Sequence, residues 1–241
     1  CKNCKFIFTA EVFDEGSLNK FYNTLYSGSQ LSQFKSSENY EFTMRFMSHI
    51  NFIKINIDLN NGMNILEIGP NENGMISTFR LHCKPNYFYF DQIEFPVINH
   101  FGGKRLGDYF SVKSASSAKI NKKMDLIVLS HSFEHFEPEH LNRDILAMKL
   151  ALKKNGHVSI EVPLELITEM HAPHTQFFNV KNMSLLFEKH GFEIIGSQTI
   201  NIPSESFKNN LIKKSIISSE LSVKLIKKII SIFIPRKIRL M

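Results

Sequence analysis

The sequence is short of cysteine, and it lacks any apolar run long enough to cross a membrane. Its 241 residues include only Cys1, Cys4 and Cys83. A small and odd number of cysteines does not build a disulfide framework and is typical of a reducing compartment. A simple transmembrane helix needs about 20 apolar residues in a row, and no run of even about 18 occurs. No signal peptide is visible either, so we expect a cytoplasmic protein.

Basic charge is concentrated near the C-terminal end. The net charge is +6 at pH 7. Residues 207–241 hold nine Lys and Arg residues and one Glu, so this segment alone carries +8. The remainder, with 20 basic and 22 acidic residues, is nearly neutral. This distribution argues against a general polyanion-binding surface, and nucleic acid is therefore not an expected partner.

The C-terminal segment has an amphipathic pattern that allows two interpretations. The apolar side of a possible helix comprises Leu221, Leu225, Ile229, Ile232 and Phe233, and the basic side comprises Lys224, Lys227 and Lys228. Such a helix can lie on an anionic surface, which would place the protein at the inner face of the membrane through residues 221–241. It can also be a terminal helix docked on the sheet or on a partner. Residues 206–241 are therefore treated as a separate basic tail.

Cys1 and Cys4 have the spacing of one turn of a zinc knuckle. A structural zinc site needs four ligands, and the sequence contains no second pair. The pair is either the second half of a zinc ribbon whose first half lies upstream of residue 1, or two ordinary thiols on a loop. On the first interpretation, residues 1–35 are a partial zinc-ribbon-like segment. Zinc binding is expected only if an upstream pair exists.

Residues 63–74 are predicted to form a central strand followed by a ligand-binding turn. The apolar residues of 65–68 enclose Glu67, and Gly69 follows them. Glycine lets the backbone turn sharply and approach a ligand because it has no Cβ. A buried strand that ends in this way is typical of sites for nucleotide-sized ligands, although similar turns occur where nothing binds.

An acidic residue after the next expected strand strengthens this interpretation. Residues 86–90 are rich in aromatics and end at Asp91, 22 positions after Gly69. In nucleoside-binding βαβ units, an acidic residue about 20 positions on accepts hydrogen bonds from the ribose hydroxyls. The alternative is a solvent-exposed aspartate at a strand end.

Strands and helices alternate along the rest of the chain. The expected strands are 65–68, 86–90, 109–113, 123–130, 157–162 and 192–195, and the expected helices are 40–57, 76–81, 138–152 and 179–190, with a loop over 101–107. The segment 123–130 is apolar on both faces, as a central parallel strand must be. This order predicts an α/β fold with helices on both faces of a mostly parallel sheet.

Taken in order, these segments resemble a class I S-adenosylmethionine-dependent methyltransferase, of the branch that often carries an N-terminal zinc ribbon. The matching pieces are Ile65–Gly69, Asp91, Asp125–Val128, Glu134–Phe136, Leu152–Gly156 and Leu185–Phe192. The resemblance covers roughly residues 60 to 200. It implies a Rossmann-like, seven-stranded sheet with a reversed final hairpin. It also implies S-adenosylmethionine at the carboxyl ends of the first two strands, in a domain that we assign to residues 36–205.

The resemblance also assigns binding residues. Glu67 and the turn of Gly69, Pro70 and Asn71 would hold the methionine part of the cofactor, Asp91 would hold the ribose, and Ser130 and His131 would line the cofactor after the fourth strand.

Two departures from the family pattern keep a second function open. Asn71 and Asn73 stand where the family usually has glycines. Residues 114–116 (Ser-Ala-Ser) stand where an acidic residue often faces the adenine. A catalytically degenerate binding or scaffold protein is therefore an alternative.

Four histidines are candidates for acceptor chemistry. Methyl transfer from a sulfonium requires alignment of donor and acceptor and removal of a proton, and histidine suits the second task near neutral pH. His131 and His135 follow the fourth strand, and His171 and His174 follow the fifth. All four are expected to face one cleft, and His174, His135 and His171 are the catalytic candidates. His174 resembles the post-strand histidine of sugar methyltransferases, although a Tyr near His171 and a Glu near Pro173 are missing here.

The sequence thus predicts methyl transfer to a small molecule, namely a sugar nucleotide or a glycan intermediate of surface polysaccharide synthesis. An RNA methyltransferase is a further alternative, against which the nearly neutral body of the chain argues. The acceptor itself is not predicted, because acceptor specificity lies in loops that vary freely on this fold.

Overall fold

The structure is a computed structural model that describes residues 6–8, 17, 38–70, 74–92, 94–115, 123–164, 174–201 and 236–240. The chain divides into two compact units. One unit comprises Cys1–Phe8, Phe46–Ile200 and Lys237–Met241, and the other comprises Thr9–Arg45 and Asn201–Arg236. The first unit contains the sheet and the candidate site.

Seven strands of the described residues form one sheet, in the order β4-β3-β2-β5-β6-β9-β8. The strands are β2 (Asn64–Ile68), β3 (Asn86–Phe90), β4 (Lys104–Gly107), β5 (Met124–Ser130), β6 (Leu152–Pro163), β8 (Ser197–Asn201) and β9 (Arg236–Leu240). The five strands from β4 to β6 are paired in parallel, whereas β9 is antiparallel to β6. The predicted α/β fold, with a mostly parallel sheet that is reversed near one edge, is confirmed.

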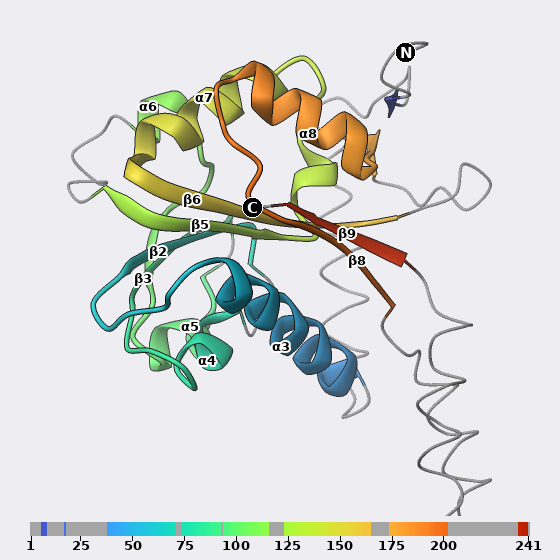
Figure 1. Cartoon of the computed structure of the whole chain (residues 1–241). Coiled ribbons are helices and arrows are strands. Elements are labelled where there is room, and N and C mark those ends of the chain that lie inside the picture. Colours follow the sequence, from blue (N-terminus) through green and yellow to red (C-terminus); the bar gives the residue numbers. More distant parts are fainter. Residues whose placement is uncertain are drawn as a thin grey trace, which may run out of the picture. The chain divides into compact units, whose positions relative to one another are not determined.

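Helices cover both faces of this sheet (Figure 1). One face carries α3 (Glu38–Asn56), α4 (Ile76–Phe79) and α5 (Pro96–His100), and the other carries α6 (Val112–Ala115), α7 (Leu141–Ala151) and α8 (Val180–Lys189). In α3, the regularly spaced Phe46, Ile50 and Ile53 are buried, as an apolar helix face against a sheet requires. Among the described residues, we find no helix with the length and apolarity needed to span a bilayer.

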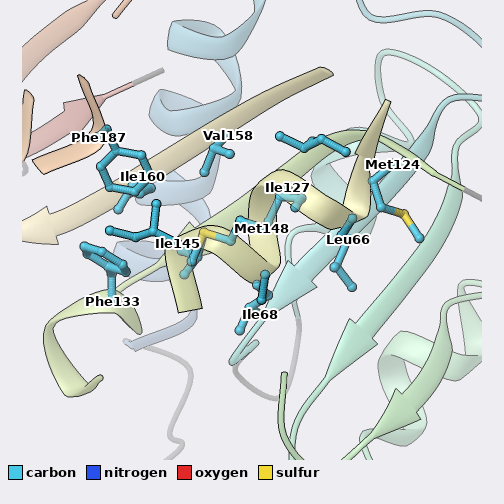
Figure 2. Packing of buried hydrophobic residues seen from close by; sticks show 14 of the residues in the cluster. Leu66, Ile68, Met124, Ile127, Phe133, Ile145, Met148, Val158, Ile160 and Phe187 are labelled. Carbon is cyan, nitrogen blue, oxygen red and sulfur yellow. The ribbon is translucent and has the colours of Figure 1, made fainter. Parts of the chain in front are cut away.

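The main hydrophobic cluster lies between the sheet and helices α7 and α8 (Figure 2). It includes Leu66, Ile68, Ile127, Val158 and Ile160 from the strands, and Ile145, Met148 and Phe187 from the helices. Every residue of β2 is buried, because both faces of this central strand are covered.

The prediction of a loop over 101–107 and a strand over 109–113 is wrong. The strand β4 is Lys104–Gly107, and α6 already begins at Val112. An edge strand is stabilised by backbone hydrogen bonds to its neighbour, here β3, and needs no apolar run. The apolar Phe110, by contrast, packs the edge of its ring on Phe90, with 5.5 Å between the ring centroids.

The predicted strand over 192–195 is also wrong, because β8 begins at Ser197. Phe192 instead closes the end of α8. Its N–H donates to the carbonyl of Phe187 at 3.1 Å, and the two rings lie 5.4 Å apart. Phe192 therefore packs against the helix end, in the manner of a C-terminal cap.

The strand β6 starts earlier than predicted. Asn155 and Gly156 fall between the expected helix 138–152 and the expected strand 157–162, but they lie within β6, which begins at Leu152. The pairing with β5 is irregular here, because its register shifts between Met124 and Leu126. Asn155 has a φ of +63°, a left-handed conformation that asparagine tolerates better than most residues. This irregularity is why the Asn-Gly pair falls inside a strand.

A separate two-stranded sheet joins the beginning of the chain to the segment after His174. The strand β1 (Ile7–Phe8) is antiparallel to β7 (Gln176–Phe177). Cys1, Cys4 and most of the expected tail lie outside the described residues, so the zinc-ribbon segment and the amphipathic helix stay predictions. Within 206–241, the described residues are those of β9.

Candidate active site

The turn after β2 begins at a glycine that no other residue can easily replace. Gly69 has a φ of +67°, and a Cβ there would lie 2.8 Å from the Cβ of Ser132. The Ser132 hydroxyl donates to the carbonyl of Ile68 at 2.8 Å, and the Gly69 N–H donates to the carbonyl of Phe90 at 3.0 Å. These bonds tie the turn to the ends of both β5 and β3. Pro70 follows and is buried, and Asn71 lies outside the described residues.

Glu67 supports the same turn from within the protein. Its side chain is buried, and Oε2 accepts hydrogen bonds from the Met75 N–H at 3.0 Å and from the Tyr87 hydroxyl. Burial and the neighbouring carboxylate raise the pKa of Tyr87 well above its usual value, so the phenol stays protonated and donates. Because Glu67 precedes the turn and Met75 follows it, this carboxylate fixes both ends of the turn.

Asp91 lies beside Gly69 at the same edge of the sheet. Ile68 pairs with Phe90, so Gly69 and Asp91 are the first residues beyond the last pair of two parallel strands. The Asp91 N–H donates to the carbonyl of Gly107 at 3.1 Å, and its own carbonyl accepts from Arg105 Nε at 2.9 Å. Its side chain is half-buried. A left-handed turn and a carboxylate at adjacent strand ends suit a nucleoside ligand.

Three histidines surround the buried carboxylate of Glu134. Its Oε1 lies 3.6 Å from His131 Nδ1, 3.9 Å from His174 Nε2 and 4.0 Å from His135 Nε2. The rings of His135 and His174 meet edge to face, with 4.7 Å between centroids. The imidazoles are 15–21% exposed and Glu134 is 1% exposed. The structure thus brings three of the four expected histidines together, and His171 lies outside the described residues.

Backbone contacts fix the position of this cluster. His131 has a φ of +56°, which is uncommon for a residue other than glycine and often marks a functional site. Glu134 and His135 lie in the short 3-10 helix η3 (Phe133–His135). Thr175 donates to the carbonyl of Glu134 from its N–H at 3.2 Å and from its hydroxyl at 3.3 Å. The segment that carries His174 is therefore joined directly to η3.

Ser130, which was expected to line the cofactor, belongs to a buried polar network. Its hydroxyl donates to Glu161 Oε2 at 3.4 Å, and the same oxygen lies 3.2 Å from His49 Nδ1. The other ring nitrogen of His49 lies 2.8 Å from the Ser159 hydroxyl. The Glu161 carbonyl accepts from the His131 N–H at 2.9 Å, so the network lies directly against the cluster.

Residues 50–197 match a family model described as a methyltransferase domain. The match covers more than half of the chain. The chain belongs to this methyltransferase family. The predicted class I S-adenosylmethionine-dependent methyltransferase is thereby confirmed at the level of family and fold.

Solved structures of known methyltransferases have the same fold as this methyltransferase. One is a SAM-dependent methyltransferase from Archaeoglobus fulgidus, with 15% identity, a TM-score of 0.55, and coverage of 90% of this chain and 98% of that chain. Another is the 1,6-didemethyltoxoflavin-N1-methyltransferase of Burkholderia thailandensis, with 10% identity, a TM-score of 0.54, and coverage of 96% and 91%. A third is the N-methyltransferase NodS from Bradyrhizobium japonicum, with 12% identity, a TM-score of 0.51, and coverage of 80% and 83%. No curated protein matches this methyltransferase in sequence.

Two residues of the methyltransferase site are missing from the sequence prediction. In the sequence, Glu134 is recognisable only as a carboxylate that lies three positions after His131 and one position before His135. The 3-10 turn of η3 brings these side chains together. Glu161 lies in an apolar strand, where its alternation with Ile160 and Val162 places it on the opposite face from the hydrophobic cluster. Its partner His49 lies 112 positions away, and no local signal connects the two.

A groove of about 550 Å³ lies elsewhere on the methyltransferase. Its lining includes Lys149, Lys153, His157 and Phe192. These residues surround the amino-terminal part of β6. The groove is therefore distinct from the candidate site, which lies at the carboxyl ends of the parallel strands.

The support that Tyr87 gives to Glu67 can be measured. Tyr87→Phe should lower the free energy of unfolding at pH 8 by about 1–3 kcal/mol, because a buried carboxylate oxygen loses a donor. Since the pKa of Tyr87 is raised on folding, its contribution is complete below the ordinary value of about 10 and is lost as the pH rises above it. In urea unfolding, the difference between wild type and variant should therefore shrink at pH 11. Tyr109→Phe, at an exposed site, is the control; equal differences for Tyr87→Phe at both pH values would contradict the prediction.

Proposed function

We propose that this methyltransferase transfers the methyl group of S-adenosylmethionine to a small molecule, a sugar nucleotide or a glycan intermediate of surface polysaccharide synthesis. The observation that carries the proposal is the position of the histidine cluster after β5, at the same sheet edge as Gly69 and Asp91. Neighbours of the same fold are named for small-molecule acceptors, such as 1,6-didemethyltoxoflavin and phosphoethanolamine. This supports a small acceptor rather than a nucleic acid.

The residues at the ends of β2 and β3 fit the cofactor. The turn of Gly69, Pro70 and Asn71 would hold the methionine part, with Glu67 fixing the turn, and Asp91 would accept hydrogen bonds from the ribose hydroxyls. Ser130 and His131, at the end of β5, would border the same space. Bound there, S-adenosylmethionine supplies a methyl group made electrophilic by its sulfonium.

The histidine cluster would act on the acceptor. For a hydroxyl acceptor, the cofactor would supply the methyl group and its sulfur would keep the electron pair of the broken carbon–sulfur bond, so the protein would have to orient the acceptor and remove the hydroxyl proton. His174 Nε2 is the atom proposed to take that proton, with His135 beside it and Glu134 stabilising the imidazolium. His171, three positions before His174 in the sequence, would contribute as well.

The basic tail would bring the enzyme to an acceptor at the membrane surface. A lipid-linked or membrane-associated glycan intermediate lies at an anionic surface, to which the basic segment 221–241 would bring the enzyme. We accordingly place the protein in the cytoplasm and at the inner face of the membrane.

The proposal is tested by calorimetric titration of S-adenosylmethionine and S-adenosylhomocysteine into the wild type, Asp91→Ala and Asp108→Ala. Asp108, exposed and near Asp91, is the matched control for loss of a carboxylate. Both ligands should bind the wild type and Asp108→Ala, and binding to a folded Asp91→Ala should be weakened about 10- to 150-fold, since a hydrogen bond to a charged group contributes about 1.5–3 kcal/mol. A folded wild type that binds neither ligand would refute the proposal in favour of a degenerate scaffold. Release of S-adenosylhomocysteine with a panel of sugar nucleotides then tests the acceptor class.

A further inference from the structure

The spacing of the cluster around Glu134 is longer than that of hydrogen bonds. The three nitrogens lie 3.6, 3.9 and 4.0 Å from one carboxylate oxygen, whereas hydrogen bonds of this kind are about 2.7–3.2 Å long. Ligands bound to one metal ion at about 2.0–2.2 Å lie roughly 3–4.4 Å from one another. The observed separations therefore match atoms that share an ion.

We propose that Glu134, His135 and His174 bind a divalent first-row transition-metal ion. One ligand atom from each of these residues lies within 4.8 Å of the other two. Two imidazoles and one carboxylate suit ions such as Zn²⁺, Fe²⁺ or Co²⁺, whereas Mg²⁺ and Ca²⁺ prefer oxygen ligands alone. His131, with Nδ1 at 3.6 Å from the carboxylate, lies close enough to join them after a small movement of its ring.

Burial and charge support an ion at this position. Glu134 is 1% exposed, and a positive charge beside a buried carboxylate stabilises its ionised form. A dication bound at Oε1 supplies that charge. Thr175 fixes the backbone of Glu134, and Gln176 donates to the carbonyl of Phe136. Both hydrogen bonds are accepted by backbone carbonyls in or directly after η3, so they hold the backbone that carries Glu134 and His135 in place.

The ion would also have a role in the proposed methyl transfer. This catalytic role rests on the proposed function, whereas binding of the ion does not. Three protein ligands leave coordination positions open. An acceptor with adjacent hydroxyl groups, such as a sugar, could occupy them. The ion would make an acceptor hydroxyl ionise more readily, and its proton would pass to water. Because a coordinated His174 cannot also take a proton, the ion would replace it in that task.

A second group of metal-ligating side chains provides a control. Glu137, Glu139 and His140 also lie close together, but none of them is buried. His140 Nδ1 is already paired with Glu137 Oε2. His140→Ala thus removes a nearby imidazole without touching the proposed ligands.

The test is titration of Zn²⁺ and Co²⁺ into the untagged full chain with Cys1→Ser and Cys4→Ser, which removes the thiol pair. Calorimetry and the visible absorption of Co²⁺ measure binding without any methyl transfer. We expect one ion per chain, at least about 100-fold weaker binding in His174→Ala and Glu134→Gln, and no change in His140→Ala. Circular dichroism checks that each variant is folded. His174, which is partly exposed, keeps the test decisive if Glu134→Gln fails to fold.

Two results would overturn the proposal. One is the absence of a bound ion in the folded chain, and the other is binding that is lost in His140→Ala but kept in His174→Ala. The titration with S-adenosylmethionine is independent of both. Cofactor binding without ion binding would leave methyl transfer standing and remove the ion, whereas the reverse result would remove methyl transfer and leave a metal site.

Discussion

Gly69→Ala is expected to weaken binding of S-adenosylmethionine at least about 10-fold and to lower the free energy of unfolding by about 2–5 kcal/mol. A left-handed conformation costs a residue with a Cβ about 1–2 kcal/mol, and relief of a close contact in a packed site costs about 1–3 kcal/mol more. The contact is with the Cβ of Ser132, at 2.8 Å. Moving the turn away from Ser132 also displaces the backbone that would hold the cofactor, and displacements near 1 Å can cost about 100-fold in function. Calorimetric titration and urea unfolding measure the two effects.

Gly62→Ala separates the backbone effect from the steric one. Gly62 has a φ of +80°, but a Cβ there has no atom within 4 Å. This variant should lose only about 1–2 kcal/mol and should bind the cofactor like the wild type. Adding Ser132→Gly to Gly69→Ala should restore part of the stability, when compared with Ser132→Gly alone. If Gly62→Ala and Gly69→Ala behaved alike, the contact with Ser132 would have no effect.

Glu161→Leu is expected to destabilise the fold by about 3–5 kcal/mol, because it removes one member of a fully buried imidazole–carboxylate pair. Glu161 and His49 are both fully buried and lie 3.2 Å apart, and Ser130 donates to the same carboxylate. Without Glu161, an imidazole and a hydroxyl lose a partner inside the protein. Urea unfolding at pH 7 measures the effect.

The double variant His49→Leu and Glu161→Leu tests whether the pair acts as a unit. It should lose less stability than the sum of the two single variants, because the imidazole and the carboxylate are removed together and neither remains buried without the other. Glu188→Leu, at an exposed position of α8, is the control and should change stability by less than about 0.5 kcal/mol. Strict additivity of the two single effects would show that His49 and Glu161 are independent.

The central strands could be predicted because burial on both faces leaves a continuous apolar run. β3 and β5 are found within a residue of the predicted limits. The edge strand β4 could not be predicted, because Lys-Arg-Leu-Gly is held in place by the backbone of β3 and not by its own side chains. The segment 192–195 was predicted to be a strand because it is apolar, but Phe192 packs on the end of α8 and β8 begins only at Ser197.

The sequence predicted correctly which strands the histidines of the candidate site follow. It did not predict that Glu134 is the carboxylate around which they gather. Glu134 follows a strand and looks like any polar residue of a turn. The left-handed backbone at His131 and the hydrogen bonds from Thr175 and Gln176 bring the separate segments together. These contacts join residues about 40 positions apart, as the 41 positions between Glu134 and Thr175 illustrate, and local pattern carries no information about them.

The docking of β1 on β7 is an equilibrium that involves residues next to the candidate site. The register sets Phe8 opposite Gln176, two residues after His174. A ladder of two residues per strand opens at little free-energy cost. Thermodynamic reciprocity then applies: a ligand that orders His174 strengthens the docking of β1, and stronger docking of β1 raises the affinity for that ligand by the same factor. The two-residue strand thus couples the position of Phe8 to that of Gln176, two residues after His174.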